Sequence, residues 1–280
     1  MSYIISVPRL KKRLENNNDN TVIVDVRFQL KNSEAGRKQY IKDHLPGAVY
    51  LDLEKDLSSK AAKHGGKHPL PDMEKLARKL GNIGIDQETC VVIYDQTNDM
   101  FAARLWWLLH CLGHERSYVL DGGYEEWVRQ GGSVTDKVPV ISSKLFNPVM
   151  REEQTVNIDE VKQKLEKDAA VLIDSREMDR YLGKTEPLYH KAGHIPGAKN
   201  YFWKGVLNDR GAWKKDRELQ EHFSAIPEET EVIVSCGSGI SACPNILALK
   251  MAGYENVKLY PGSFSDWISY DENKIETKEE

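Results

Sequence analysis

Short apolar runs rich in β-branched residues alternate along the chain with longer amphipathic stretches. The runs that predict buried parallel strands cover residues 22–26, 91–95, 117–121, 170–174, 231–235 and 257–261. Residues 100–112 and 240–251 place apolar side chains at helical spacing and have a glycine just beyond, so they predict helices. This alternation predicts an α/β protein made of two small domains, each with a mostly parallel central sheet flanked by helices.

The two halves of the chain carry the same motifs in the same order. The matching segments are 22–27 with 171–176, 44–48 with 194–198, 90–95 with 231–236, and 120–127 with 260–267. The offset is 149 residues at the first match, 150 at the second and 141 at the third, and it is 140 when Val92 is set against Val232 and Trp127 against Trp267. A unit of this length is far longer than a solenoid repeat, so the pattern indicates duplication of a whole domain.

The expected domain boundaries follow from this duplication. The region between the two copies holds two prolines and little periodicity, which is typical of a linker. We therefore expect a first domain over residues 1–138, a linker over 139–155 and a second domain over 156–280.

Composition and charge limit the kinds of partner, cofactor and compartment to be expected for this protein. A net charge of -4 gives no reason to expect a nucleic-acid or membrane partner, and no apolar run approaches the roughly 18 residues of a membrane span. No secretory signal is visible at the start of the sequence. The four cysteines are too few and too irregularly spaced for a disulfide framework or a zinc site. We expect a cytoplasmic protein that needs no metal and no organic cofactor.

The two copies differ at the loop that follows the strand 231–235. With an offset of 140, Gln96 in the first copy faces Cys236 in the second, where the loop carries Gly237 and Gly239. Glycines allow successive backbone N–H groups to face an anion, and the following helix adds its positive end. Such a loop would stabilise a cysteine thiolate. A buried structural cysteine is the commoner role for an isolated residue, but this context favours a nucleophile.

These features resemble those of the tandem-domain rhodaneses. The resemblance rests on HLPGA and HIPGA at 44–48 and 194–198, the LDGG and YPGS motifs with their tryptophans, and the loop Cys-Gly-Ser-Gly-Ile-Ser-Ala-Cys at 236–243. It covers about residues 22–267 and is strongest to 3-mercaptopyruvate sulfurtransferases, whose loop typically reads CGSGxTAC. Thiosulfate-using relatives typically have Arg and Lys at the positions of Gly237 and Ser238. Since thiosulfate is a dianion, an uncharged loop favours the keto-acid donor.

The resemblance implies roles for individual residues. Cys236 would take the sulfur as a persulfide, while Gly237, Gly239, Ile240 and Ser241 would complete the loop around the bound donor. Ser238 would act with His68 and an acid, which is Glu54 or, as a second choice, Asp52. Arg180 would bind the carboxylate of the donor. A second substrate arginine that is frequent in these enzymes is absent, and His190, Lys191 or Lys184 would have to replace it.

The expected reaction is a sulfurtransferase cycle of the ping-pong type. Sulfur would move from 3-mercaptopyruvate to Cys236 with release of pyruvate, and then to cyanide, a small thiol or a reduced protein thiol of the thioredoxin type. The alternatives are a thiosulfate:cyanide sulfurtransferase and, second, a non-catalytic rhodanese-like binding protein. A cysteine phosphatase would need an arginine six positions after Cys236, where the chain has Ala242. The sequence leaves the oligomeric state open.

Overall fold

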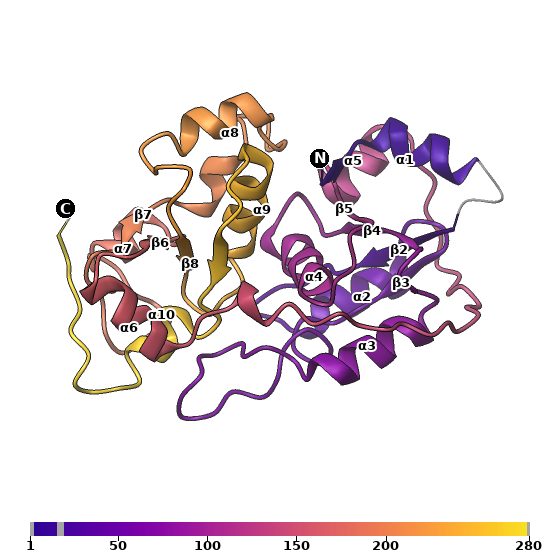
Figure 1. The fold of residues 1–280 in the computed structure, drawn as a ribbon. Coiled ribbons are helices and arrows are strands. Elements are labelled where there is room, and N and C mark those ends of the chain that lie inside the picture. Colours follow the sequence, from indigo (N-terminus) through magenta and orange to yellow (C-terminus); the bar gives the residue numbers. More distant parts are fainter. Residues whose placement is uncertain (1–2, 16–19, 279–280) are drawn as a thin grey trace. The chain divides into compact units, whose positions relative to one another are not determined.

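The computed structural model describes residues 3–15 and 20–278 (Figure 1). The chain divides into two compact units, each of which takes a short segment from the other half of the sequence. Unit 1 comprises Met1–Ser59, Leu70–Arg151 and Asn208–Trp213. Unit 2 comprises Lys60–Pro69, Glu152–Leu207 and Lys214–Glu280.

Unit 1 contains a five-stranded parallel sheet in the order β1-β5-β4-β2-β3. The strands are β1 (Ile4–Ile5), β2 (Thr21–Asp25), β3 (Ala48–Tyr50), β4 (Cys90–Tyr94) and β5 (Ser117–Leu120). The helices are α1 (Val7–Leu14), α2 (Glu34–Lys42), α3 (Met73–Asn82), α4 (Met100–Cys111) and α5 (Gly123–Arg129). Every residue of β4 is buried, and α4 is buried along nearly its whole length, so these two elements form the centre of this unit.

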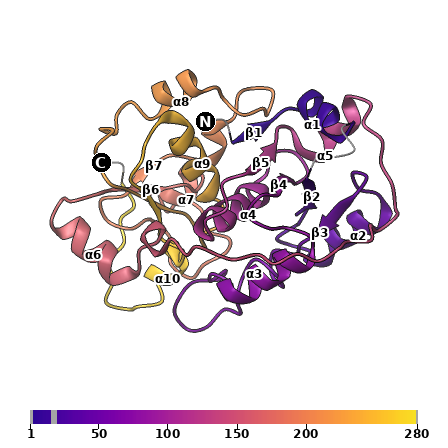
Figure 2. The ribbon, with the colours of Figure 1, turned by 45° about the vertical axis from the view of Figure 1, so that its right-hand side comes forward.

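Unit 2 contains a four-stranded parallel sheet in the order β7-β6-β8-β9. The strands are β6 (Val171–Asp174), β7 (Lys199–Asn200), β8 (Val232–Ser235) and β9 (Val257–Leu259). The helices are α6 (Ile158–Glu166), α7 (Met178–Tyr181), α8 (Asp216–His222), α9 (Cys243–Ala252) and α10 (Ser263–Trp267), with short 3-10 helices η1 (Glu152–Gln154) and η2 (Trp203–Val206). In both units the helices flank the sheet (Figures 1 and 2).

The predicted α/β class is confirmed, and all six predicted strands are present within a residue or two. The strands β1, β3 and β7 were not predicted, because runs of two or three residues are too short to show a period. Residues 139–151, all of them described, contain no helix or strand, while η1 lies inside the expected linker of 139–155, whose bounds stay a prediction. No helix in the described part of the chain is long and apolar enough to cross a bilayer.

Equivalent ion pairs stabilise the two sheets at the ends of β2 and β6. Arg27 Nη2 lies 2.7 Å from Asp25 Oδ2, and Arg176 Nη2 lies 2.6 Å from Asp174 Oδ2, with all four side chains almost fully buried. Each arginine also donates to the backbone carbonyl of the loop beside it, at Asp43 and Gly193. Buried charges that are paired and hydrogen-bonded in this way hold a strand end to its neighbouring loop.

Candidate active site

The buried thiol of Cys236 lies directly after β8 and accepts a hydrogen bond from its own loop. Cys236 is 1% exposed, and its Sγ lies 3.1 Å from the backbone N of Gly239. The N–H of Gly239 points back toward the sulfur because this residue has a φ of +79°, and a Cβ there would lie 2.4 Å from the Pro261 carbonyl oxygen. One backbone amide of the predicted anion-binding loop is thus directed at the sulfur.

The helix after this loop begins later than the sequence predicts. Residues 236–242 form bends and turns, and α9 begins at Cys243 rather than at Ile240. Pro244 stands in the first turn of the helix, where its missing N–H costs nothing. In the loop, Ile240 is buried and Ser241 is half-buried.

Ser263 supports the loop from α10, and sequence reasoning did not single it out. Its Oγ accepts the backbone N–H of Cys236 at 3.1 Å and lies 3.9 Å from the Cys236 sulfur. The next two residues of α10, Phe264 and Ser265, donate their backbone N–H groups to the carbonyls of Cys236 and Gly237. Ser263 has a φ of +53°, which is unusual for a residue with a side chain. The feature of the sequence that could have pointed to Ser263 is the difference between the copies at this position, where the first copy has Gly123.

His68 and Ser238 meet, as the sequence predicts. His68 Nδ1 lies 2.8 Å from Ser238 Oγ. The segment Lys60–Pro69 belongs to unit 2, because Gly65 N–H donates to Asp266 Oδ1 at 2.7 Å and Lys67 N–H donates to Ser265 Oγ at 3.1 Å. These backbone hydrogen bonds to α10 hold the histidine beside the loop.

Glu54 and Asp52 both lie in unit 1, and they are placed differently within it. Glu54 is exposed and donates its backbone N–H to Asp52 Oδ1 at 2.9 Å. Asp52 is 4% exposed, and its Oδ1 also accepts the N–H of Lys55. Asp52 therefore serves as the cap of its own turn, whereas the Glu54 side chain is exposed and has no such structural role in the described contacts.

Arg180 has its guanidinium held on one edge by Glu186. Its Nε and Nη2 donate to the two carboxylate oxygens at 2.9–3.2 Å, and Glu186 also pairs with Arg176 Nη1 at 3.3 Å. Among the described residues, Arg180 Nη1 has no hydrogen-bond partner. Since Glu186 and Asp174 neutralise both arginines, this cluster brings little net positive charge to the site.

Tyr189 was not expected to be functional and lies against the loop. A Cβ on Gly237 would stand 2.7 Å from the Tyr189 hydroxyl, so the tyrosine fills the space beside this glycine. Burial, together with the nearby Cys236 thiolate, raises the pKa of Tyr189 to about 12. Its neighbours that were considered as replacements for the missing arginine point elsewhere: Lys191 pairs with Asp271 at 3.8 Å, and Lys184 with Asp179 at 3.7 Å.

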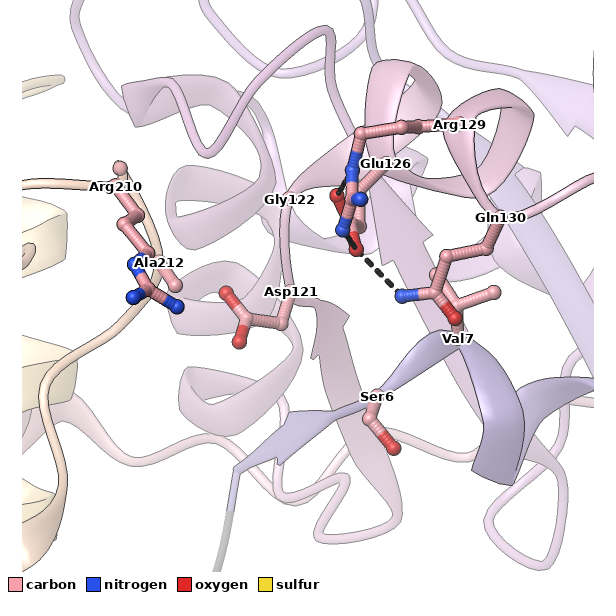
Figure 3. Close-up of a pocket in the computed structure, with 10 residues that line it drawn as sticks. Ser6, Val7, Asp121, Gly122, Glu126, Arg129, Gln130, Arg210 and Ala212 are labelled. Carbon is pink, nitrogen blue, oxygen red and sulfur yellow. Dashed lines mark hydrogen bonds and ion pairs between the residues drawn. The ribbon is translucent and has the colours of Figure 1, made fainter.

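Each unit contains a cavity. The cavity in unit 2, about 330 Å³, lies beside Tyr189 and is also lined by Lys63, Lys67, His190 and Ser265. The cavity in unit 1, about 360 Å³, is shown in Figure 3. There the Arg210 guanidinium and the Asp121 carboxylate face one another, and Glu126 is held by Arg129 and Gln130. It contains none of the predicted site residues.

The residue that corresponds to Cys236 in the first copy is Asp95, not Gln96. Asp25 pairs with Tyr94 in one sheet and Asp174 pairs with Ser235 in the other, so the next residues, Asp95 and Cys236, are equivalent. The carbonyls of Asp95 and Cys236 likewise accept equivalent N–H groups from α5 and α10. In the sequence, runs such as VVIY and VIVS can be aligned at an offset of either 140 or 141. The strand register decides between these two alignments.

Asp95 is itself surrounded by loop amides. Its Oδ1 accepts the backbone N–H of Asp99 at 3.0 Å, and its Oδ2 accepts that of Ala102 at 2.9 Å. Complete burial and the charge of Asp99 raise the pKa of Asp95 from 3.8 to about 7. The first copy thus holds a buried carboxyl group where the second holds a thiol.

Fold and site together define a duplicated α/β protein in which one copy carries a buried cysteine on a glycine-containing loop. The family model of the rhodanese-like domain matches the chain twice, over residues 6–130 and 157–270. The chain therefore belongs to the rhodanese family, which confirms the resemblance and the expected tandem of two rhodanese-like domains.

Relatives of assigned activity cover most of the chain. A probable 3-mercaptopyruvate sulfurtransferase of Pseudomonas aeruginosa is 35% identical over 99% of this chain and 98% of its own length. The thiosulfate sulfurtransferase of Bos taurus is 30% identical over 88% and 84%. The crystal structure of SseA from Escherichia coli, described as a 3-mercaptopyruvate sulfotransferase, has a TM-score of 0.82 and 30% identity over 95% of this chain and all of its own. The protein is thus a sulfurtransferase, as predicted.

Proposed function

We propose that the protein moves sulfur from 3-mercaptopyruvate, through a persulfide on Cys236, to a thiophilic acceptor. The observation that carries this proposal is the contact of 2.8 Å between His68 and Ser238 on an uncharged loop. Cleaving the C–S bond of a keto-acid thiol needs a proton at carbon, which a serine–histidine pair can deliver. Cleaving the S–S bond of thiosulfate releases sulfite and has no such need.

The first half-reaction transfers the donor sulfur to Cys236. The Cys236 thiolate attacks the donor sulfur, an S–S bond forms and the C–S bond breaks, with its electron pair going to carbon. The donor's thiol proton ends on that carbon through Ser238 and His68. The products are pyruvate and the Cys236 persulfide anion. The Gly239 N–H would stabilise the negative Cys236 thiolate from which the attack begins.

Glu54 and Arg180 complete the proposed site. An ionised carboxylate beside His68 would favour its protonated form and so assist proton delivery. Glu54 suits this role better than Asp52, whose Oδ1 already accepts two backbone N–H groups. Arg180 would use its remaining Nη1 for the donor carboxylate, because Glu186 occupies the other edge.

The second half-reaction returns the enzyme to its starting state. Cyanide attacks the outer sulfur of the persulfide, which gives thiocyanate and the Cys236 thiolate. A small thiol or a reduced protein thiol of the thioredoxin type would take the same sulfur as its own persulfide. Cyanide is the convenient acceptor for an assay.

The proposal is tested by incubating the protein separately with 3-mercaptopyruvate and with thiosulfate, and measuring the intact mass. We expect a gain of one sulfur atom that is lost in Cys236→Ser and retained in the matched variant Cys111→Ser, whose cysteine is buried in α4. No gain from either donor would contradict the mechanism. Steady-state kinetics then compare the donors, and a higher kcat/KM for thiosulfate would overturn the donor assignment.

A further inference from the structure

Gly237 is a glycine for a different reason from Gly239. The backbone at Gly237 does not have the positive φ that excludes side chains, so only its surroundings limit what can stand there. The three heavy atoms nearest to a hypothetical Cβ all belong to Tyr189: Oη at 2.7 Å, Cε2 at 3.3 Å and Cζ at 3.4 Å. Tyr189 therefore occupies the space that a side chain at position 237 would need.

The ring of Tyr189 is held in this place by its neighbours. Lys67 Nζ lies 4.5 Å from the ring centroid and donates to the carbonyl of Leu188 at 2.7 Å, and Arg180 Cζ lies 5.4 Å from the same centroid. Phe264 meets the ring edge-on, with centroids 6.1 Å apart. Cation–π and aromatic contacts of this kind restrain the ring against swinging away from Gly237.

The hydroxyl of Tyr189 adds a second constraint on the loop. Its Oη is the atom nearest to a Cβ at position 237, and the next residue, Ser238, has its Oγ 2.8 Å from His68 Nδ1. A side chain at position 237 would therefore have to displace the tyrosine hydroxyl directly beside the residue that contacts His68.

We propose that Tyr189 is a specificity-determining residue that keeps a cationic side chain out of position 237, beside Ser238 and the Cys236 loop. This inference rests on the proposed function and deepens it. Arg176 and Arg180 are neutralised by Asp174 and Glu186. The loop itself therefore carries no cation, and either donor is left with one N–H group of Arg180 and the neighbouring Lys67. These groups suffice for a monocarboxylate, whereas a dianion would gain from a further cation at position 237.

The steric part of the proposal is tested by a double-mutant cycle on stability, which needs no activity. The variants are Gly237→Ala, Tyr189→Ala and the two combined, each unfolded in urea. We expect Gly237→Ala to lower the unfolding midpoint with Tyr189 present and to leave it unchanged in the Tyr189→Ala background. Equal effects of Gly237→Ala in both backgrounds would overturn the steric claim.

The specificity part is tested by kinetics with both donors. Tyr189→Phe keeps the ring over Gly237, so we expect the ratio of kcat/KM for the two donors to stay within about twofold of the wild-type ratio. Tyr189→Ala combined with Gly237→Arg should raise the ratio of kcat/KM for thiosulfate to that for 3-mercaptopyruvate by at least about tenfold over both single variants. Tyr118→Phe in unit 1, half-buried on β5, is the matched control and should behave as the wild type.

The kinetic results distinguish failure of the proposed sulfurtransfer from failure of the proposed role of Tyr189. A wild-type protein that is inactive with both donors contradicts the proposed function. A wild-type protein that prefers 3-mercaptopyruvate, with a double variant whose donor ratio is unchanged, contradicts the inference alone. If the arginine variant does not fold, the same ratio is measured on Tyr189→Ala with Gly237→Lys, which also brings a cation to position 237, and no rise is again contradictory.

Discussion

His68 Nδ1 lies 2.8 Å from Ser238 Oγ, although 170 residues of sequence separate the two. The contact is built by the backbone around it: the segment before His68 donates N–H groups to Asp266 and Ser265, and those residues belong to the helix that also supports the Cys236 loop. The histidine and the loop are thus attached to one element, α10, which fixes their separation.

Ser238→Ala is expected to lower kcat with 3-mercaptopyruvate about a hundredfold and to lower activity with thiosulfate much less. The reason is that only the first donor needs a proton on carbon as its bond breaks. Steady-state kinetics with cyanide as acceptor measure both. Ser224→Ala, at an exposed serine of the same unit, is the control. Equal losses with the two donors would mean that Ser238 acts only by shaping the loop.

Arg180→Lys is expected to raise the KM for either anionic donor roughly tenfold or more while the KM for cyanide stays the same. Lysine cannot keep the paired hydrogen bonds to Glu186 and present a further N–H to the donor at the same time. The matched control is Arg217→Lys, an exposed arginine paired with Glu221 on α8. A change in kcat without a change in donor KM would remove Arg180 from donor binding.

The duplication, the class of fold and the Cys236 loop could be read from the sequence because each depends on local patterns. Six strands were found from their apolar runs, and Cys236 stood out because its loop differs between copies. His68 was placed only through the resemblance to a family, since its contact with Ser238 joins distant parts of the chain.

Other features depend on packing that no local pattern records. The one-residue shift that pairs Asp95 rather than Gln96 with Cys236 follows from strand register, and β-branched runs match equally well at neighbouring offsets. Tyr189 lies in a segment without regular structure. Its proposed role depends on its ring lying against Gly237, a contact that no local sequence pattern records. Ser263 was hidden because a serine with positive φ looks like any other loop serine.

Asp174→Asn is expected to destabilise the protein by about 3–5 kcal/mol, the usual cost of leaving one partner of a buried ion pair without compensation. Arg176 would keep Glu186 and the carbonyl of Gly193, and it also lies 4.0 Å from the ring of Phe264 under the loop. Urea unfolding measures the loss, and Asp25→Asn at the equivalent pair of unit 1 should cost a similar amount. A loss below about 1 kcal/mol would fall in the range of a surface pair and contradict the buried one.

Asp95 is expected to make the protein less stable as the pH rises from about 4 to about 7. Its pKa is 3.8 in an ordinary environment and about 7 in the folded state, so between these values the folded protein holds a proton that the unfolded chain has released. The state that binds more protons loses stability as the pH rises, with a slope of at most about 1.4 kcal/mol per pH unit. Above pH 7 the contribution is fully lost.

Asp95→Asn isolates this effect from the other titrating groups. The amide cannot titrate, and because its nitrogen cannot accept one of the two backbone N–H groups, the variant carries a constant cost of about 1–3 kcal/mol. The quantity to measure is the difference in unfolding free energy between wild type and variant at several pH values. We expect the wild type's advantage to shrink steadily from pH 4 to pH 7 and then to level off. A difference that stays flat, or that grows with pH, would show that the loop amides hold Asp95 in its charged form, as they would an anion.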